Sequence, residues 1–151
     1  MPPDKLALEN AKRKALDAAS REDPSTPVLG ADTVVATEGL ILGKPQNEED
    51  ARRMLRLLSG KRHFVYTGIA LAHLGHLYEH AEKTSVWVAP LTEDEIDGYI
   101  KTGEPADKAG AYAVQGIAAK FIPRIEGSFS NVVGLPLSAV RNLLGKAGIS
   151  V

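Results

Sequence analysis

The sequence has the length and composition of a single globular domain. Its 151 residues are 44% hydrophobic and 25% charged, outside the range of disordered chains, so we expect one domain spanning residues 1–151. The formal net charge of -1 argues against a general nucleic-acid binder. Cysteine is absent, which excludes a disulfide framework, a cysteine-ligated zinc ion and a thiol nucleophile.

The sequence gives no indication of a membrane partner. No apolar run approaches the roughly 20 residues that cross a bilayer, and the first residues form a charged amphipathic stretch without a secretory cleavage pattern. The lack of cysteine fits a reducing compartment. We therefore expect a cytoplasmic protein that binds neither membrane nor nucleic acid.

The chain begins with a helix signal followed by a strand signal. Apolar residues at helical spacing predict a helix that Asp4 caps and that runs to about Ala19. A turn containing two prolines then leads into residues 28–36, which are apolar on both faces. Such a pattern is typical of a central strand.

A short strand and a well-marked helix come next. Glu38-Gly39 predicts a tight turn into a strand over residues 40–42. Asn47 predicts the cap of a helix over residues 48–59, whose first turn is acidic and which Gly60 ends. These local signals agree with one another.

The middle of the chain predicts a long hairpin and another helix. β-Branched and aromatic residues indicate strands over 64–71 and 77–88, joined near Leu74-Gly75. Thr92 and Glu95 have the spacing of a capping box and predict a helix directly after them.

The last third predicts a short strand and a final helix. Residues 107–116 are rich in glycine and alanine, and a strand is expected around residues 121–125. The final helix should begin near Pro136 and end before Gly148. Its inward-facing residues are expected to be Leu137, Val140, Leu143 and Leu144.

The alternation of helices and strands predicts an α/β or α+β fold, a mixed β-sheet with helical cover. Ligands of such folds usually lie at loops that follow strands, here residues 43–45 and 127–134. The second loop offers hydroxyls, an amide and a flexible backbone that suit phosphate or sugar, and equally an ordinary turn.

Asp32 is the most informative single residue. An ionised carboxylate within a strand of Val, Leu and Ala is unfavourable unless it is paired, hydrogen-bonded or bound to a metal. One interpretation is a functional acid, and the other is an aspartate at a strand end that caps a neighbouring loop. Local pattern alone weighs the two equally.

Two lysines and one glutamine are candidate ligand contacts. Lys44 lies between a flexible glycine and a rigid proline, so its ammonium could be aimed at a phosphate, although turn lysines are usually solvated. Lys14 lies on a helix with an alanine-rich opposite face, where a solvated charge is the plainer interpretation. Gln115 could read a base edge with its amide or satisfy a backbone group.

Three histidines, His73, His76 and His80, are close together in the sequence. On a hairpin, the turn and the period-two geometry do not bring all three side chains to one point. Exposed hairpin residues are therefore favoured over a metal site.

The order of these signals is similar to that of the Maf proteins, also described as septum-formation proteins. The resemblance covers nearly the whole chain, and its two longest segments are too long for chance agreement. The matching segments are residues 10–15, 30–35, 41–45, 54–60, 65–68, 103–116 and 127–137.

The resemblance implies an enzyme that cleaves a nucleoside triphosphate between its α and β phosphates. It assigns Asp32 as the catalytic proton acceptor that activates water, and Lys14 and Lys44 as phosphate contacts. It also implies a divalent metal cation as cofactor, Mg²⁺ or Mn²⁺, to neutralise charge on the triphosphate.

The subgroup also follows from the resemblance. Members acting on dTTP and UTP carry Asp-Thr and a Tyr-Ala-x-Gln-Gly segment, as this chain does at Thr33 and Gln115. These two residues are expected to determine substrate specificity, because a neutral amide suits a pyrimidine edge that presents both a carbonyl and an N–H.

One family feature does not precede Met1. Family members begin with a strand and a Ser-x-Ser-Pro-Arg-Arg loop, so we expect the first strand and helix of the family fold to be missing, through a misassigned start, a fragment or a natural truncation. The competing function is therefore a catalytically impaired nucleotide-binding or cell-division regulatory protein. Family members are often homodimers, which implies a homodimer here.

Overall fold

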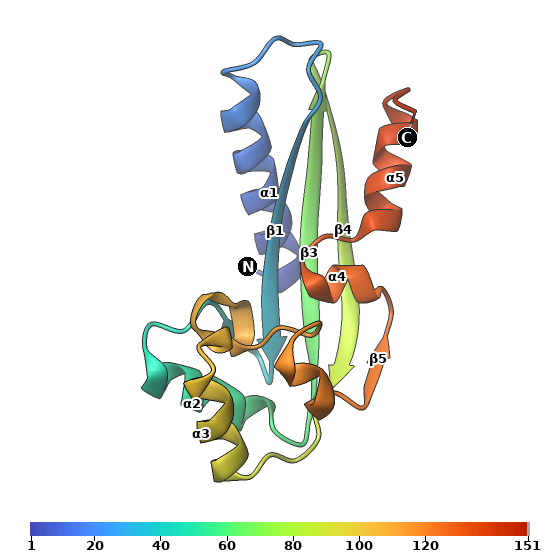
Figure 1. Ribbon diagram of the computed structural model, residues 1–151. Coiled ribbons are helices and arrows are strands. Elements are labelled where there is room, and N and C mark those ends of the chain that lie inside the picture. The colour runs from blue at the N-terminus through green and yellow to red at the C-terminus, as the bar shows by residue number, and fades with distance from the viewer. Residues whose placement is uncertain (151) are drawn as a thin grey trace. The chain divides into compact units, whose positions relative to one another are not determined.

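The computed structural model describes residues 1–150 and contains helices and one five-stranded sheet (Figure 1). The strand order is β2-β1-β3-β4-β5, with antiparallel pairing of β1 with β2 and of β4 with β5. This confirms the α+β fold class. In chain order the elements are α1 (Pro3–Ala19), β1 (Val28–Thr37), β2 (Leu40–Leu42), α2 (Glu48–Leu58), β3 (Arg62–His73), β4 (His76–Trp87), α3 (Glu93–Lys101), the 3₁₀ helices η1 (Glu104–Asp107), η2 (Ala109–Ala111) and η3 (Ile117–Phe121), β5 (Arg124–Glu126), α4 (Phe129–Val133) and α5 (Leu137–Lys146).

The chain divides into two compact units. Unit 1 consists of Met1–Thr33, Tyr66–Lys83 and Ser130–Val151, and unit 2 of Val34–Val65 and Thr84–Phe129. The three long strands β1, β3 and β4 each contribute residues to both units. The single-domain organisation expected from the composition remains a prediction.

In unit 1, helix α1 lies unusually close to the sheet because small residues meet on both sides. Ala7, Ala11 and Ala15 are fully buried and recur every four residues on one face of α1. A Cβ added at Gly30 would lie 2.7 Å from the Ala15 nitrogen, and one at Gly68 would lie 2.5 Å from the carbonyl carbon of Ala7. The two glycines are therefore required by space, and they fix the position of α1 on the strands.

Helix α5 covers the other face of the sheet in unit 1, as Figure 1 shows. Leu143 packs with Ile69 and Leu71 of β3, whereas the intervening Ala70 packs against α1. Successive residues of a strand point to opposite faces, so the two helices sandwich β3. Leu137, expected to point inward, is 61% exposed, because it is the first residue of α5 and precedes the turn that reaches the sheet.

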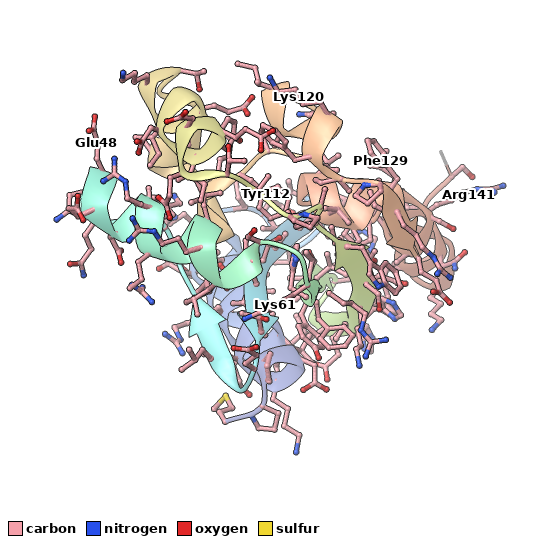
Figure 2. The ribbon with its side chains drawn as sticks, turned by 90° about the horizontal axis from the view of Figure 1, so that it is seen from below. Glu48, Lys61, Tyr112, Lys120, Phe129 and Arg141 are labelled. Carbon is pink, nitrogen blue, oxygen red and sulfur yellow. The ribbon has the colours of Figure 1, made fainter. Side chains whose placement is uncertain are left out.

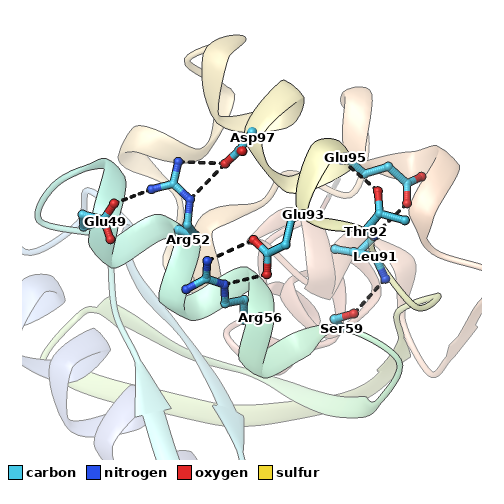
Figure 3. Close-up of polar contacts among 9 residues, drawn as sticks. All are labelled: Glu49, Arg52, Arg56, Ser59, Leu91, Thr92, Glu93, Glu95 and Asp97. Carbon is cyan, nitrogen blue, oxygen red and sulfur yellow. Dashed lines mark hydrogen bonds and ion pairs between the residues drawn. The ribbon is translucent and has the colours of Figure 1, made fainter.

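In unit 2, ion pairs join α2 to α3 (Figure 3). Arg52 donates two hydrogen bonds to Asp97 Oδ1 at 2.9 and 2.8 Å, and Arg56 binds both carboxylate oxygens of Glu93 at 2.9 and 3.0 Å. The hydrogen bond to Glu93 is the main reason that the pKa of Arg56 is raised. Beneath these pairs, the apolar face of α2 packs inward with four buried residues, Ala51, Met54, Leu55 and Leu58.

The core of unit 2 holds a buried polar pair. His63 and Tyr112 are both inaccessible or nearly so, and His63 Nε2 lies 2.6 Å from the Tyr112 hydroxyl. Figure 2 shows Tyr112 in the interior, whereas Glu48 and Lys120 project outward. Burial lowers the pKa of His63 to about 4, so the imidazole is neutral near pH 7.

The expected turns and caps of α2, α3 and the long hairpin are confirmed. Asn47 Oδ1 accepts a hydrogen bond from the Asp50 N–H over 2.8 Å, and Thr92 and Glu95 form the expected capping box. Leu74 and Gly75 both have positive φ at the tip between β3 and β4.

Besides the orientation of Leu137, three local expectations were wrong. Asp4 does not cap α1: the cap position is Pro2, and proline at the first helical position starts the helix without a side-chain bond. The strand expected around residues 121–125 is β5 at Arg124–Glu126, because residues up to Phe121 form η3. Residues 129–133, expected as loop, form the short helix α4.

Within residues 1–150, none of the helices is long and apolar enough to cross a membrane.

Candidate functional site

Asp32 lies within β1 and its carboxylate is compensated by two donors. Lys14 Nζ donates to Oδ1 over 2.9 Å, and the Asn10 side-chain amide donates to Oδ2 over 3.0 Å. The side chain of Asp32 is 21% exposed and that of Lys14 58% exposed. The carboxylate is therefore paired and still open to solvent, where a ligand or a water molecule can approach it.

Helix α1 positions both donors. Asn10 and Lys14 are four residues apart and so lie on the same side of the helix, beside the alanine face that contacts Gly30. Because the helix backbone contacts the strand at Gly30, the side chains of Asn10 and Lys14 reach Asp32 two residues further along β1.

Lys14 has hydrogen-bonding capacity left. Its ammonium carries three donors, and it uses two of them on Asp32 Oδ1 and on the Ala31 carbonyl oxygen, at 2.9 and 3.2 Å. A third N–H is available to an anionic ligand. The cation is thus oriented beside the carboxylate.

Thr33 follows Asp32 on β1 but contacts other residues of unit 1. Its hydroxyl lies 2.8 Å from the hydroxyl of the fully buried Thr67 and 3.3 Å from the Gly134 carbonyl oxygen. Thr67 in turn lies 3.5 Å from the carbonyl oxygen of Asn131. The pair therefore links β1 and β3 to the end of α4, and one acceptor position on Thr33 remains for a ligand.

Lys44 is exposed and belongs to unit 2, in the loop that follows β2. The Gly110 N–H donates to the Gly43 carbonyl oxygen over 3.1 Å, which anchors this loop to η2. Gly110 has φ of 72° and a Cβ there would lie 3.0 Å from Val35 Cγ1, so no other residue fits without strain.

Asp107 of η1 is an acidic residue that feels the charge of Lys44. The pKa of Asp107 is lowered, mainly by its hydrogen bond to Lys108 and also by the charge of Lys44. The loop around Lys44 thus combines a fixed backbone with a side chain whose ammonium has no ion-pair partner within 4.0 Å among residues 1–150.

Gln115 is exposed in unit 2, and hydrogen bonds hold the chain on both sides of it. The Ala113 N–H donates to the Tyr99 hydroxyl over 3.2 Å, and the Ile117 N–H donates to Glu104 Oε1 over 3.0 Å. The amide side chain of Gln115 is therefore presented to solvent from an anchored segment.

The structure brings some of the expected site residues together. Asp32 and Lys14 are in direct contact in unit 1, and Thr33 follows Asp32 on the same strand. Lys44 and Gln115 both belong to unit 2. The roles of all five residues remain predictions.

Three residues in this network were not found from the sequence: Asn10, Thr67 and Glu104. The signal for Asn10 was its spacing of four residues from Lys14 on a helix. Thr67 and Glu104 carried no local signal, because their partners are 34 and 13 residues away along the chain.

No cluster of three or more His, Asp or Glu side chains that could hold a metal ion occurs within the described part of the chain. The three hairpin histidines are in unit 1, and His80 lies 2.7 Å from Glu82. A magnesium ion in a nucleotide-processing site is commonly held by one or two carboxylates together with substrate phosphates. The oxygen donors of Asp32 fit an ion that arrives with a triphosphate.

Comparison with known proteins assigns the chain to a class. Residues 1–147 match the family described as Maf-like protein. The chain is 45% identical over 153 residues to a dTTP/UTP pyrophosphatase of Methanosarcina barkeri, covering 100% of this chain and 77% of the relative. It is 46% identical over 166 residues to one of Agathobacter rectalis, covering 99% and 81%, and 55% identical over 128 residues to one of a Geobacillus species, covering 85% and 68%.

Three findings agree on one class of protein. They are the α+β fold, the pairing of Asp32 on β1 with Lys14 on α1, and these matches. The chain belongs to the Maf family.

Proposed function

We propose that the chain is a nucleoside triphosphate pyrophosphatase. It hydrolyses dTTP, UTP and related or modified pyrimidine nucleotides to the monophosphate and pyrophosphate. The observation that carries the proposal is the open, lysine-paired Asp32 carboxylate, in a chain whose relatives at 42–55% identity are named dTTP/UTP pyrophosphatases.

Asp32 takes the proton of the attacking water. Hydrolysis adds water across the α–β anhydride, so the water must lose a proton as its oxygen bonds to phosphorus, and the bridging oxygen leaves with pyrophosphate. A carboxylate held by Lys14 and Asn10 has two of its roughly four lone-pair positions occupied, and the others can accept this proton. The two donors keep the side chain in one orientation while it acts.

Lys14 and Lys44 bind the phosphates. A triphosphate carries several negative charges and needs cationic partners to enter a protein site. The third donor of Lys14 is free for a phosphate oxygen beside Asp32, and Lys44 extends from a loop fixed by Gly110.

The proposed reaction includes a divalent cation, Mg²⁺ or Mn²⁺. When bound, it would neutralise phosphate charge and stabilise the charge that develops during cleavage. Asp32 of unit 1 would hold it together with the substrate, because a carboxylate suits a hard cation.

Thr33 and Gln115 determine the base preference. Both side chains are neutral hydrogen-bonding groups, which can recognise a base edge but cannot balance a triphosphate. Gln115 is exposed on an anchored segment, and Thr33 keeps one acceptor position beyond its bond to Thr67.

A cytoplasmic location and a homodimeric assembly belong to the same proposal. The cysteine-free composition supports the first, and the resemblance to the family supports the second.

Pyrophosphate release from a nucleotide panel, with Mg²⁺ or Mn²⁺, tests the function. We expect release from dTTP and UTP, and a loss of about a hundredfold to ten-thousandfold in kcat for Asp32→Asn, because asparagine keeps the hydrogen bond to Lys14 but cannot accept a proton at neutral pH. Asp94→Asn, at an exposed acid on α3, is the matched control and should leave the rate unchanged.

Two results would count against the proposal. Full activity of Asp32→Asn would remove Asp32 from the chemistry. Nucleotide binding without pyrophosphate release by the unaltered chain would favour the competing function, a non-catalytic nucleotide-binding or regulatory protein.

A further inference from the structure

Glu104 contacts the segment that follows Gln115. Its Oε1 accepts a hydrogen bond from the Ile117 N–H over 3.0 Å, and its Oε2 accepts one from the Ala118 N–H over 3.4 Å. These are the first two amides of η3, which have no partner within the helix. A carboxylate at this position also interacts favourably with the partial positive charge of the helix start.

Tyr99 holds the other side of Gln115. Its hydroxyl accepts a hydrogen bond from the Ala113 N–H over 3.2 Å. Burial raises the pKa of Tyr99, and its interaction with the Glu104 carboxylate raises it further. Glu104 therefore holds the chain directly after Gln115, at Ile117 and Ala118, and Tyr99 holds it before Gln115, at Ala113.

The space around Gly116 shows how closely Glu104 fits. Gly116 has a negative φ of -102°, outside the left-handed region that favours glycine. An added Cβ would instead overlap the Glu104 carboxylate. A side chain at residue 116 would therefore displace the Glu104 carboxylate, which occupies the position that the side chain would fill.

We propose that Glu104 is a positioning residue that sets the base selectivity of the enzyme by fixing residues 117–118, directly after Gln115, and thereby the amide of Gln115. The proposal rests on the proposed function, in which Gln115 contacts the base. An exposed glutamine on an unanchored loop samples many orientations, and fixing it in one orientation before binding removes that entropic penalty from recognition of the correct base. Phosphate binding and water activation use other residues and do not depend on this segment.

Kinetics with paired substrates test the proposal. For Glu104→Ala we expect kcat/KM for dTTP to fall about tenfold, mainly through KM, while kcat/KM for dGTP changes little, so the dTTP/dGTP ratio falls about tenfold. Glu104→Gln should lose less, because its amide oxygen still accepts one hydrogen bond. Asp94→Asn is the matched control and should leave the ratio unchanged.

A second variant reaches the same contact from the other side. Gly116→Ala should reduce the dTTP/dGTP ratio by displacing the Glu104 carboxylate, although Glu104 itself is intact. In the double variant Glu104→Ala/Gly116→Ala the new methyl group has room, so the two effects should be clearly less than additive. Full additivity of the two changes would overturn the proposed contact.

Amide hydrogen exchange at Ile117 and Ala118 provides a readout that does not depend on activity. Exchange should accelerate in Glu104→Ala and in Gly116→Ala, with the thermal midpoint of each close to that of the unaltered chain. Unchanged exchange, or an equal fall in kcat for dTTP and dGTP, would overturn the positioning role. If the unaltered chain released no pyrophosphate, the proposed function alone would fail, and exchange together with equilibrium dialysis of dTTP and dGTP would still decide whether Glu104 sets base preference.

Discussion

Asn10 is a residue of the candidate catalytic site that only the structure revealed. Its amide donates to Asp32 Oδ2 over 3.0 Å, on the oxygen that Lys14 does not contact. Without it, the carboxylate is held at one oxygen only and can rotate about its Cβ–Cγ bond. Asn10 is therefore expected to orient the acid without binding substrate.

We predict that Asn10→Ala lowers kcat by about tenfold and leaves KM nearly unchanged, as expected for the loss of one hydrogen bond to a charged group. Steady-state pyrophosphate release from dTTP measures both constants. Glu9→Ala is the matched control. Glu9 is the adjacent residue, and its carboxylate pairs with the ammonium of Lys12 over 3.8 Å and not with Asp32. A tenfold rise in KM at constant kcat would place Asn10 in substrate binding.

Thr33 and Thr67 allow a base contact to be separated from a structural one. Their hydroxyls are 2.8 Å apart, and replacing either threonine by valine removes this shared hydrogen bond together with one contact to a backbone carbonyl oxygen, that of Gly134 or of Asn131. We predict that Thr33→Val and Thr67→Val each lower the free energy of unfolding by about 1 kcal/mol. Only Thr33→Val should change the dTTP/UTP preference, because Thr67 is fully buried.

Denaturant unfolding and the ratio of kcat/KM for dTTP and UTP test both statements. Equal shifts in preference for the two valine variants would mean that the hydroxyl pair acts through local shape, and the assignment of Thr33 to specificity would fail.

At the scale of elements, the position of α1 depends on two glycines. We predict that Gly30→Ala lowers the free energy of unfolding by about 1–3 kcal/mol, the usual range for overpacking, because the new methyl group would lie 2.7 Å from the Ala15 nitrogen of α1. The helix must move, so pyrophosphatase activity should fall in parallel as Asn10 and Lys14 leave Asp32.

Gly98→Ala is the control for this change. Gly98 is exposed within α3 and nothing lies within 4 Å of an added Cβ, so alanine should be neutral or stabilise the helix by up to about 1 kcal/mol. Urea unfolding of both variants measures the difference. Equal stability of Gly30→Ala and the unaltered chain would show that α1 is not held by backbone contact.

Elements with local end signals could be predicted from the sequence, and elements without them could not. Asn47 and Thr92 each begin a helix by bonding to a backbone N–H three residues ahead, which is visible as residue spacing. Helix α4 has five residues, and its ends Phe129 and Val133 are both exposed, so it shows no apolar stripe. Its residue Asn131 is buried, and the Asn131 carbonyl oxygen lies 3.5 Å from the hydroxyl of Thr67, 64 residues away in the sequence.

The candidate site could be predicted only in part for the same reason. A carboxylate within an apolar strand indicates that a partner must exist, and the sequence therefore identified Asp32. The identity of that partner depends on where α1 rests on β1, which is set by the contact of Gly30 with Ala11 and Ala15. Such a contact between residues at least 15 apart leaves no periodic pattern in the sequence.

At the scale of the whole molecule, His63 couples the free energy of unfolding to pH. Burial lowers its pKa to about 4 in the folded state, whereas an unfolded chain has a histidine pKa near 6.5. Protonated histidine needs a hydrogen-bond acceptor at both ring nitrogens, and Nδ1 is buried without a partner among residues 1–150. The folded state therefore binds fewer protons than the unfolded state between pH 6.5 and 4.

We predict that the free energy of unfolding falls by about 2 kcal/mol between pH 7.5 and pH 5, because stability decreases with falling pH wherever the unfolded state binds more protons. Most of this loss should be absent in His63→Gln, which is less stable at pH 7.5 but has no imidazole to protonate. His76→Gln, at an exposed residue of the hairpin, should keep the full dependence. Urea unfolding of the three proteins at both pH values measures these differences, and an equal pH dependence in His63→Gln and the unaltered chain would show that other groups cause it.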